Sequence, residues 1–508
     1  MGTFLNAFEE ASTFGLTENG AITFTSTLNH NLDFFSMASA KRGDPSGAVR
    51  LFTEAYNEDP KLAILNAFYC RDVRGGQGER NIFRECLFHV DQKYLSDPKF
   101  LELIPEYGRW DDLFDLVYKY STNIGISNAI VDIVYHQIQK DLVSSHPSLC
   151  AKWFPLANSV SSPERKNTAR ILCRSLGWSE RDARKRIVSI RKKIHLIEQD
   201  LTEHNVTMPL ENVPSRAFQK YKRAFMRIIP EKFQEFIEMV SEGKAKINAN
   251  CIYPYEIVAK LRNEIRGSSW FGKCRNGDPT ILAALCESWK SLPEYSAKGN
   301  VLTVVDVSGS MFQQISPGSS AQAIDVSTSL GIYTAEHNLG IFKDHYISFS
   351  ARPKLLKLNP EMNLAQKLEY VWNTEVGYDT DFAAVFTTIL SGMRRNNLPR
   401  EECPSTILVI SDMEFNRVGD GHTNFEHIKD QYKRAGYDLP QLVFWNVMSR
   451  GLNVPVRKDQ NGTILLSGVS PSVLRFISEG DITPEKFMME VLFSERYRPV
   501  REVLGYQV

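Results

Sequence analysis

The feature that most constrains this chain is a short polar motif at the end of an apolar run. Residues 301–305 (Val-Leu-Thr-Val-Val) are typical of a buried β-strand, and Asp306-Val307-Ser308-Gly309-Ser310 follows directly. Ligands of open α/β sheets gather beyond the carboxyl ends of the strands, where this motif would lie. One carboxylate and two hydroxyls are hard oxygen ligands, which suit the octahedral coordination of Mg²⁺. The motif therefore predicts a site for Mg²⁺, or another divalent cation, with Asp306, Ser308 and Ser310 as ligands.

Two later segments supply candidate ligands for the same site. Thr380 precedes a helix-like run that begins at Phe382, and Asp412 follows the apolar run 406–410 (Thr-Ile-Leu-Val-Ile). We expect Thr380 to contribute a hydroxyl from a second loop and Asp412 to act from a third loop through water. The alternative is that Thr380 is only a helix N-cap and Asp412 a turn residue. The predicted ligand set is thus Asp306, Ser308, Ser310, Thr380 and Asp412.

The chain after residue 295 alternates strand-like and helix-like runs. Further strands are expected at 344–349, 442–447 and 464–466, and helices at 321–337, 364–372, 470–478 and 484–506. This alternation predicts a doubly wound, Rossmann-like α/β domain with a mostly parallel sheet and helices on both faces.

The first 295 residues show successive amphipathic helical patterns and few convincing strands. Such a series suggests an α-helical solenoid of HEAT-like pairs, although no repeat of fixed period is legible. A chain of 508 residues is long for one domain. We therefore expect two domains, a solenoid over residues 1–295 and an α/β domain over residues 296–508.

Sequence composition indicates the cellular compartment in which we expect the protein. The beginning of the chain lacks the pattern of a secretory signal, and no apolar run reaches membrane-spanning length. The eight cysteines are scattered and show neither CxxC pairs nor zinc spacing. These features predict a cytoplasmic protein with reduced thiols that does not engage a membrane.

The formal net charge is zero, but positive charge is concentrated in residues 151–300. Lysine and arginine neutralise phosphates, so this stretch is a candidate RNA surface. The alternative is a solvated helix face. Phe218, Tyr221 and Phe225 interleave the basic residues between Arg216 and Arg227, but their helical spacing favours a core stripe over a platform for bases. The candidate RNA-binding residues are Arg165, Lys166, Arg170, Arg174, Arg184, Lys185, Arg191, Lys192, Lys220, Lys222 and Arg223.

Catalytic signatures are missing from the sequence. It contains no Gly-x-Ser-x-Gly elbow, no His-Glu-x-x-His motif and no Cys/His cluster. Asp111 and Asp112 are adjacent, so we expect their side chains to diverge on a helix. A metal-assisted nuclease usually needs more carboxylates than Asp306 and Asp412 provide. We expect a protein that is not an enzyme.

The strand that ends in Asp-x-Ser-x-Ser, together with Thr380 and Asp412, resembles the metal-ion-dependent adhesion site (MIDAS) of von Willebrand A domains. A helical region followed by such a domain resembles the TROVE-module proteins, which include the Ro ribonucleoproteins. Local motifs are similar to a further family, domain of unknown function 2828. They include residues 71–80 (Arg-Asp-Val-Arg-Gly-Gly-Gln-Gly-Glu-Arg), 107–113 (Tyr-Gly-Arg-Trp-Asp-Asp-Leu) and 243–248 (Gly-Lys-Ala-Lys-Ile-Asn).

The resemblance implies a ring-like solenoid, closed or abutted by the von Willebrand A domain. It also implies a non-catalytic RNA-binding scaffold whose partner is a small structured or single-stranded RNA. The metal ligands carry over by their motifs, whereas no RNA-contacting residue does. The second hypothesis is a metal-dependent protein-interaction module, in which an acidic residue of a partner completes the coordination of the ion.

The motif at residues 71–80 has two physical interpretations. Arg71, Arg74 and Arg80 have the charge to hold a phosphate together with backbone amides. In the alternative, Asp72 and Glu79 pair with these arginines and lock a turn between two helices. We favour the structural interpretation. The glycines do not form a Walker loop, because no Lys-Ser or Lys-Thr follows them.

Overall fold

The computed structural model describes residues 11–158, 162–194, 196–205, 207–267, 277–349, 353–373, 381–418, 422–478 and 480–506. Helices dominate the described chain up to Lys290, and a six-stranded sheet begins at Val301. The expected order, a mostly helical region followed by an α/β region, is therefore confirmed. Within the described residues no helix is both long and apolar enough to cross a membrane.

The helices of the first part are short and begin at clear local signals. Proline occupies the first turn of many of them, and the preceding Asp44, Asp59, Asp97 or Asp278 accepts hydrogen bonds from backbone N–H groups. The elements are α2 (His30–Met37), η1 (Ala38–Lys41), α3 (Pro45–Glu58), α4 (Pro60–Arg71), α5 (Arg80–Leu87), α6 (Gln92–Leu95), α7 (Pro98–Tyr107), α8 (Trp110–Lys119), α9 (Ile124–Val143), α10 (Cys150–Trp153), α11 (Pro163–Ser175), α12 (Glu180–Ile194), α13 (Ile197–Thr202), η2 (Leu210–Asn212), α14 (Ser215–Ile228), α15 (Pro230–Ser241), α16 (Pro254–Arg266) and α17 (Pro279–Lys290).

The sheet has the strand order β5-β4-β3-β6-β7-β8. All neighbouring strands are parallel except β4 and β5. The mostly parallel sheet is as expected, whereas the antiparallel edge strand β5 was not. The elements are β3 (Val301–Asp306), η3 (Gly309–Phe312), α18 (Ala323–Glu336), β4 (His345–Phe349), β5 (Lys354–Lys357), α19 (Leu364–Trp372), α20 (Phe382–Asn396), η4 (Arg400–Glu402), β6 (Thr406–Ser411), α21 (Asn424–Ala435), β7 (Gln441–Asn446), β8 (Thr463–Ser467), η5 (Pro471–Phe476), α22 (Pro484–Leu492), η6 (Glu495–Tyr497) and α23 (Arg498–Val503).

Alternate residues of the buried strands enter two different cores. Val304 of β3 belongs to a compact cluster with residues of α20 and α21 on one face of the sheet. Val305 belongs to a much larger cluster that includes α18, α2 and α22 and continues into the helical region. This division follows from the two-residue period of a strand. One face of the sheet therefore shares its core with the helical region.

Residues 11–40, which lie far from the sheet in sequence, are held against it. A hairpin of β1 (Phe14–Leu16) and β2 (Ile22–Phe24) reaches the sheet region, where Phe24 and Val454 exchange two backbone hydrogen bonds of 3.1 and 2.9 Å. Ser467 of β8 donates its hydroxyl hydrogen to the carbonyl of Phe35 in α2 at 3.0 Å.

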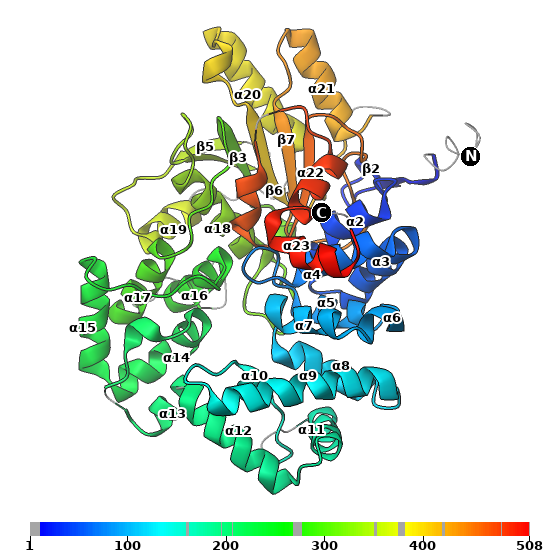
Figure 1. Ribbon diagram of the computed structural model, residues 1–508. Helices are drawn as coiled ribbons and strands as arrows, with labels where there is room; N and C mark the ends of the chain where they lie inside the picture. Colours follow the sequence, from blue (N-terminus) through cyan, green and yellow to red (C-terminus); the bar gives the residue numbers. More distant parts are fainter. Residues whose placement is uncertain are drawn as a thin grey trace.

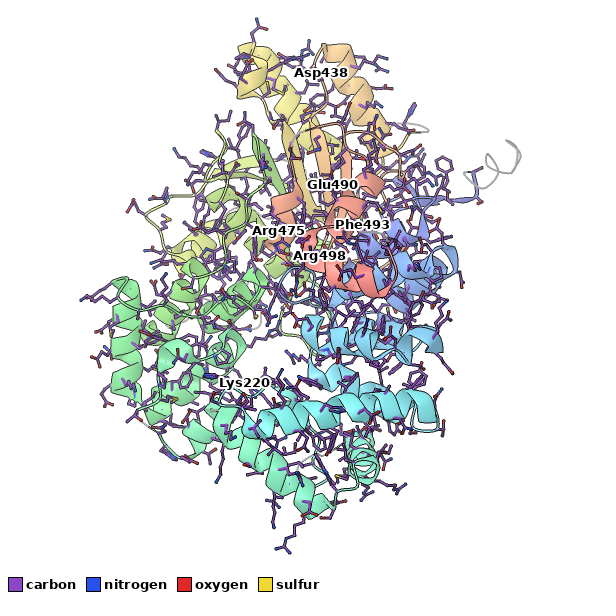
Figure 2. The ribbon with its side chains drawn as sticks, viewed as in Figure 1. Lys220, Asp438, Arg475, Glu490, Phe493 and Arg498 are labelled. Carbon is purple, nitrogen blue, oxygen red and sulfur yellow. The ribbon has the colours of Figure 1, made fainter. Side chains whose placement is uncertain are left out.

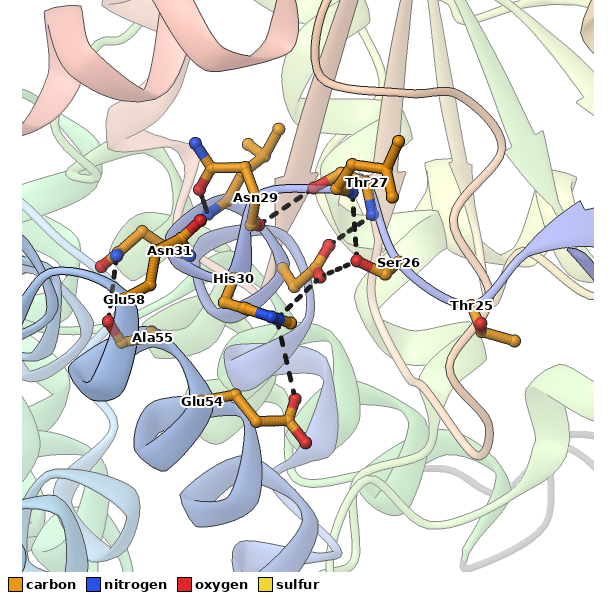
Figure 3. Close-up of polar contacts among 12 residues, drawn as sticks. Thr25, Ser26, Thr27, Asn29, His30, Asn31, Glu54, Ala55 and Glu58 are labelled. Atoms are coloured by element: carbon orange, nitrogen blue, oxygen red, sulfur yellow. Dashed lines mark hydrogen bonds and ion pairs between the residues drawn. The ribbon is translucent and has the colours of Figure 1, made fainter. Parts of the chain in front are cut away.

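Polar contacts hold the start of α2 (Figure 3). The side chain of Asn29 accepts from the N–H of Leu32 at 2.9 Å. The carboxylate of Asp33 accepts from the N–H of Thr27 at 2.7 Å and from the hydroxyl of Ser26 at 2.5 Å. Burial raises the pKa of Asp33, and these hydrogen bonds oppose that rise. The turn before α2 is therefore held by side chains that accept hydrogen bonds from its backbone.

The helical region forms an arc that starts and ends beside the sheet (Figure 1). At its beginning α2 lies against β8, and at its end α16 lies against α18, where Arg262 and Asp325 form a fully buried ion pair with Nε and Oδ1 2.8 Å apart. Between these contacts the chain runs out to α11 and α12 and returns through α13 to α17.

The end of the chain differs from the prediction of one helix over 484–506. The helix stops at Leu492, and the 3₁₀ turn η6 separates α22 from α23. Proline at residue 499 explains a new helix start, because proline is favoured in the first turn of a helix. Arg496 of η6 donates to both carboxylate oxygens of Asp72 at 2.8 and 3.0 Å, so this break attaches the C-terminal segment to the end of α4.

Candidate functional site

The carboxyl end of β3 presents the predicted motif as a tight polar turn. Asp306 is fully buried, and its Oδ1 accepts from the N–H of Ser308 at 2.8 Å. The hydroxyls of Ser308 and Ser310 lie 3.1 Å apart. The hydroxyl of Ser327 in α18 donates to the backbone carbonyl of Asp306 at 2.9 Å, which holds the turn against the following helix. Three predicted ligands are therefore gathered at one strand end.

The neighbouring strand β6 brings Asp412 to the same edge. Ser411, the last residue of β6, donates its hydroxyl hydrogen to Oδ2 of Asp306 at 2.6 Å. Asp412 follows it, is buried, and accepts from the N–H of Glu414 at 3.2 Å and from Nη2 of Arg450 at 3.0 Å. Because β3 and β6 are adjacent and parallel, their carboxyl ends meet, as the sequence predicted. Thr380 lies outside the described residues.

The charge at this edge is incompletely balanced. Asp412 has the guanidinium of Arg450 as a partner, whereas Asp306 accepts hydrogen bonds from the uncharged donors of Ser308 and Ser411. The pKa of Asp306 is raised to about 7, chiefly by burial and then by the nearby carboxylate of Asp412. A buried carboxylate without a cationic partner is costly, and a bound cation would remove that cost.

The residues present fit a divalent cation. Two carboxylates and two hydroxyls from Asp306, Asp412, Ser308 and Ser310 offer the oxygen donors that Mg²⁺ prefers. Among the described residues no group of three or more His, Cys, Asp and Glu side chains forms a metal cluster. A site here would therefore depend on the serine hydroxyls and on water.

Sequence reasoning did not find three acidic and basic side chains beside this edge. Arg450 follows β7 and also pairs with Glu18 of the N-terminal segment, with Nη1 and Oε2 2.8 Å apart. Glu414 accepts from the N–H of Glu18 at 2.7 Å and from the amide of Asn453 at 2.7 Å. The position of Arg450 beyond a third parallel strand was the available signal. Glu18 carried none, because nearly 400 residues separate it from Glu414.

The candidate RNA-binding residues lie on α11, α12 and α14 in three kinds of environment. Lys222 is buried, and Arg191 is half-buried and donates to the carbonyls of Ala151 and Phe154 at 2.8 and 2.9 Å. Arg165 and Lys166 are also half-buried. The exposed members are Arg170, Arg174, Arg184, Lys185, Lys192, Lys220 and Arg223.

The aromatic residues of α14 belong to the core, as expected. Phe218 and Phe225 are buried, and both rings lie within about 6 Å of the ring of Phe233 in α15. Tyr221 is half-buried and accepts from Lys220 at 2.8 Å. Bases therefore have no access to the two phenylalanine faces.

The motif at residues 71–80 forms a locked turn, but its partners differ from the expected ones. Asp72 pairs with Arg496 rather than with an arginine of the motif. Glu79 receives two hydrogen bonds from Nε of Arg42, at 2.9 and 3.0 Å. The expected pairings within the motif are wrong, because both carboxylates point toward arginines of distant segments.

Arg71 contributes instead to a buried network at the start of α8. Its Nε donates to Asp112 at 2.8 Å, and Arg84 contacts Asp112 at 2.5 Å and Asp111 at 2.8 Å. Asp111 and Asp112 therefore do not diverge as expected, since the fork of one guanidinium reaches both. This network explains how Asp111 and Asp112 can be charged although they are buried.

Comparisons with known proteins agree with part of the family resemblance predicted from the sequence. The family described as "Domain of unknown function (DUF2828)" matches residues 17–94 and 131–294, and the family described as "Domain of unknown function (DUF7788)" matches residues 300–499. "Uncharacterized protein L728" of Acanthamoeba polyphaga mimivirus is 26% identical over 529 residues, which cover 95% of this chain and 88% of that protein.

A solved structure, that of the Deinococcus radiodurans RO (RSR) protein, covers 90% of this chain and 92% of its own at 15% identity. Its TM-score of 0.34 is too low to carry an argument about fold or function. The predicted similarity to the domain of unknown function 2828 family is thus confirmed, over two stretches of the helical part of the chain.

Proposed function

We propose that this protein is a non-catalytic RNA-binding scaffold of the Ro type. In this proposal a HEAT-like, TROVE-like solenoid (residues 1–295) holds RNA in the cytoplasm. A von Willebrand A-like domain (residues 296–508) carries a magnesium site. The ligand would be a small structured or single-stranded RNA, held mainly through its phosphates.

The observation that carries the proposal is the positive face of α12. Arg184, Lys185 and Lys192 are exposed, and no carboxylate of the described chain lies within ion-pair distance of them, although Asp182 interacts with Lys185 at longer range. Neighbouring α11 adds Arg174, which is likewise exposed and unpaired among the described residues. A solvated helix in a chain of zero net charge usually carries interspersed acidic residues, whereas those of α12, Glu180 and Asp182, are confined to its first turn.

The experiment is a charge reversal on this face with a matched control. The test variant carries Arg184→Glu, Lys185→Glu and Lys192→Glu. Arg191 is left intact because it binds backbone carbonyls. The control carries Arg394→Glu, Arg395→Glu and Lys433→Glu, three exposed residues of α20 and α21. Figure 2 shows Lys220 on the helical arc and Asp438, which follows α21, at the opposite end of the molecule.

RNA that co-purifies from native cells is sequenced, and its affinity is measured by fluorescence anisotropy at increasing salt. We expect the test variant to lose RNA and to lower the salt dependence by about two units of slope, since each phosphate contact contributes about 0.7 for a single strand. The control should change affinity little. Equal affinities of the test and control variants would exclude the α12 face as the RNA surface.

A second candidate function rests on the edge formed by β3 and β6. Asp306, Ser308, Ser310 and Asp412 would hold Mg²⁺, with Thr380 as the further predicted ligand. The bound ion would present a coordination position to a carboxylate of a protein partner. Ser310 is half-buried and Gly309 is exposed, so the motif is accessible from solvent.

Isothermal titration with Mg²⁺ tests this candidate. Asp306→Ala should abolish Mg²⁺ binding, whereas Asp438→Ala, which removes an exposed carboxylate elsewhere, should not. Circular dichroism checks that the fold survives. Magnesium binding that persists in Asp306→Ala would rule out this site. A partner that EDTA does not release would rule out the metal-dependent module.

A further inference from the structure

A cavity between the helical arc and the sheet domain is lined mainly by arginine. Its volume is about 290 Å³, and it is built from the ends of η1 and α4, the starts of α5, α8 and α14, and the loop after η3. The polar lining consists of Arg42, Arg71, Arg80, Arg109, Arg216, Glu79, Asn81 and Ser316. Five guanidinium groups thus face one cavity that contains a single carboxylate.

The positive charge of this cavity is only partly neutralised. Glu79 is paired with Arg42. Arg71 is paired with Asp112, which does not line the cavity. Arg80 is exposed, and neither it nor Arg109 lies within ion-pair distance of a carboxylate in the described part of the chain. The charge of these two arginines is therefore available to a ligand.

An aromatic ring and a backbone carbonyl hold Arg109 and Arg216 in place. Arg109 lies over the ring of Trp153 at 5.0 Å. Arg216 donates to the carbonyl of Cys251 at 3.1 Å, and its nearest carboxylate oxygen, on Glu256, is 3.9 Å away. Burial lowers the pKa of Arg109, and the charges of Arg71, Arg216 and Arg80 lower it further, against the effect of Asp111. Arg109 is thus held beside like charges at a cost that an anion would relieve. The pKa of Arg216 is instead raised, because the effect of burial is outweighed by Glu256 and nearby tyrosines.

We propose that this cavity binds a phosphate group, with Arg80, Arg109 and Arg216 as its ligands and Ser316 as a further donor. Guanidinium groups bind phosphate oxygens in bidentate fashion, and several of them around one pocket define an anion site. A cavity of 290 Å³ is at the small end of ligand pockets and suits a phosphate with its sugar. The phosphate is either the terminal group of an RNA strand or that of a free nucleotide. This inference does not depend on the α12 face.

The test compares Arg80→Gln with Arg74→Gln in the full-length protein. Arg80 is an exposed, unpaired member of the cavity, so its replacement should not disturb folding. Arg74 belongs to the same loop and is exposed, but it faces Glu106 and does not line the cavity. Binding of pyrophosphate is measured by isothermal titration at low salt, and thermal melting confirms that both variants are folded.

We expect pyrophosphate to bind the unmodified protein and Arg80→Gln to weaken binding by about tenfold, the loss typical of one charge-assisted contact. Arg74→Gln should have no comparable effect. Failure of pyrophosphate to bind at millimolar concentration, or equal losses in both variants, would overturn the proposal.

Two further ligand pairs identify the source of the phosphate. Tighter binding of a 5′-phosphorylated RNA hexamer than of its 5′-hydroxyl counterpart indicates an RNA end, whereas tighter binding of AMP than of adenosine without that RNA preference indicates a free nucleotide. Both outcomes support a phosphate site. The α12 triple reversal separates the two proposals, since it should retain pyrophosphate binding even where it abolishes RNA binding.

Discussion

Lys222 offers a quantitative test of the packing of α14 against its neighbours. Its side chain is buried, and its Nζ donates to Oε1 of Gln219 at 3.2 Å. Burial, followed by the charge of nearby Lys260, lowers the pKa of Lys222 from 10.5 to about 7, and Glu264 only partly opposes this shift. We expect the replacement Lys222→Met to stabilise the protein at neutral pH. Methionine keeps the length and flexibility of the lysine stem and removes the charge.

The size of the effect follows from proton linkage. Between pH 7 and pH 10.5 the unfolded chain binds one more proton at Lys222 than the folded chain does, so stability rises with pH by about 1.4 kcal/mol per unit. At pH 7 the burial of Lys222 lowers the free energy of unfolding by roughly 4 kcal/mol, and this loss disappears near pH 10.5. For 508 residues that unfold together, this corresponds to a shift in Tm of about 4 °C.

Thermal unfolding is recorded from pH 7 to pH 10 for the unmodified protein, Lys222→Met and a control, Lys185→Met. Lys185 is an exposed lysine of α12, so its replacement should leave the pH dependence of Tm unchanged. The excess Tm of Lys222→Met should be largest at pH 7 and shrink toward pH 10. A difference that stays constant over this range would refute the burial of a desolvated amine at this position.

Two further predictions concern the turn at residues 71–80 and its surroundings. Asp112→Asn leaves buried Arg71 and half-buried Arg84 without full charge compensation and should cost about 3–5 kcal/mol in urea unfolding. Glu106→Gln, at an exposed pair of 3.9 Å, should cost under about 0.5 kcal/mol. Equal costs would contradict the network. Gly76→Ala would place a Cβ 1.9 Å from a backbone carbonyl oxygen of α4, so we expect a lower Tm. The control is Gly392→Ala on the exposed face of α20, where the new Cβ meets nothing within 4 Å. This replacement should raise the free energy of unfolding by up to about 1 kcal/mol. An unchanged Tm of Gly76→Ala would argue against the close approach.

The sequence was informative wherever the physical signal is local. Apolar runs at 301–305, 406–410 and 442–447 predicted strands that the structure contains as β3, β6 and β7. The rule that ligands gather at the carboxyl ends of parallel strands predicted that Asp306 and Asp412 meet. The helical spacing of Phe218 and Phe225 predicted core positions, which both residues occupy.

Other features could not be predicted, because they join segments hundreds of residues apart. Nothing near Glu18 indicates that it pairs with Arg450 beside the candidate metal site. The basic composition of residues 151–300 does not distinguish Lys222, which is buried, from Lys185, which is exposed. That distinction depends on which face of each helix meets a neighbour.

The sequence by itself determined the succession of a helical part and an α/β part, the parallel strands of the sheet and the meeting of Asp306 and Asp412 at their ends, because hydrophobic period and strand-end chemistry act over a few residues. Only the tertiary structure decided the partners of Asp72 and Glu79, the attachment of residues 11–40 to the sheet and the gathering of five arginines around one cavity. Ion pairs and shared cores of this kind arise from the path of the whole chain, since burial leaves each charged group only the partners that the packed helices bring within reach.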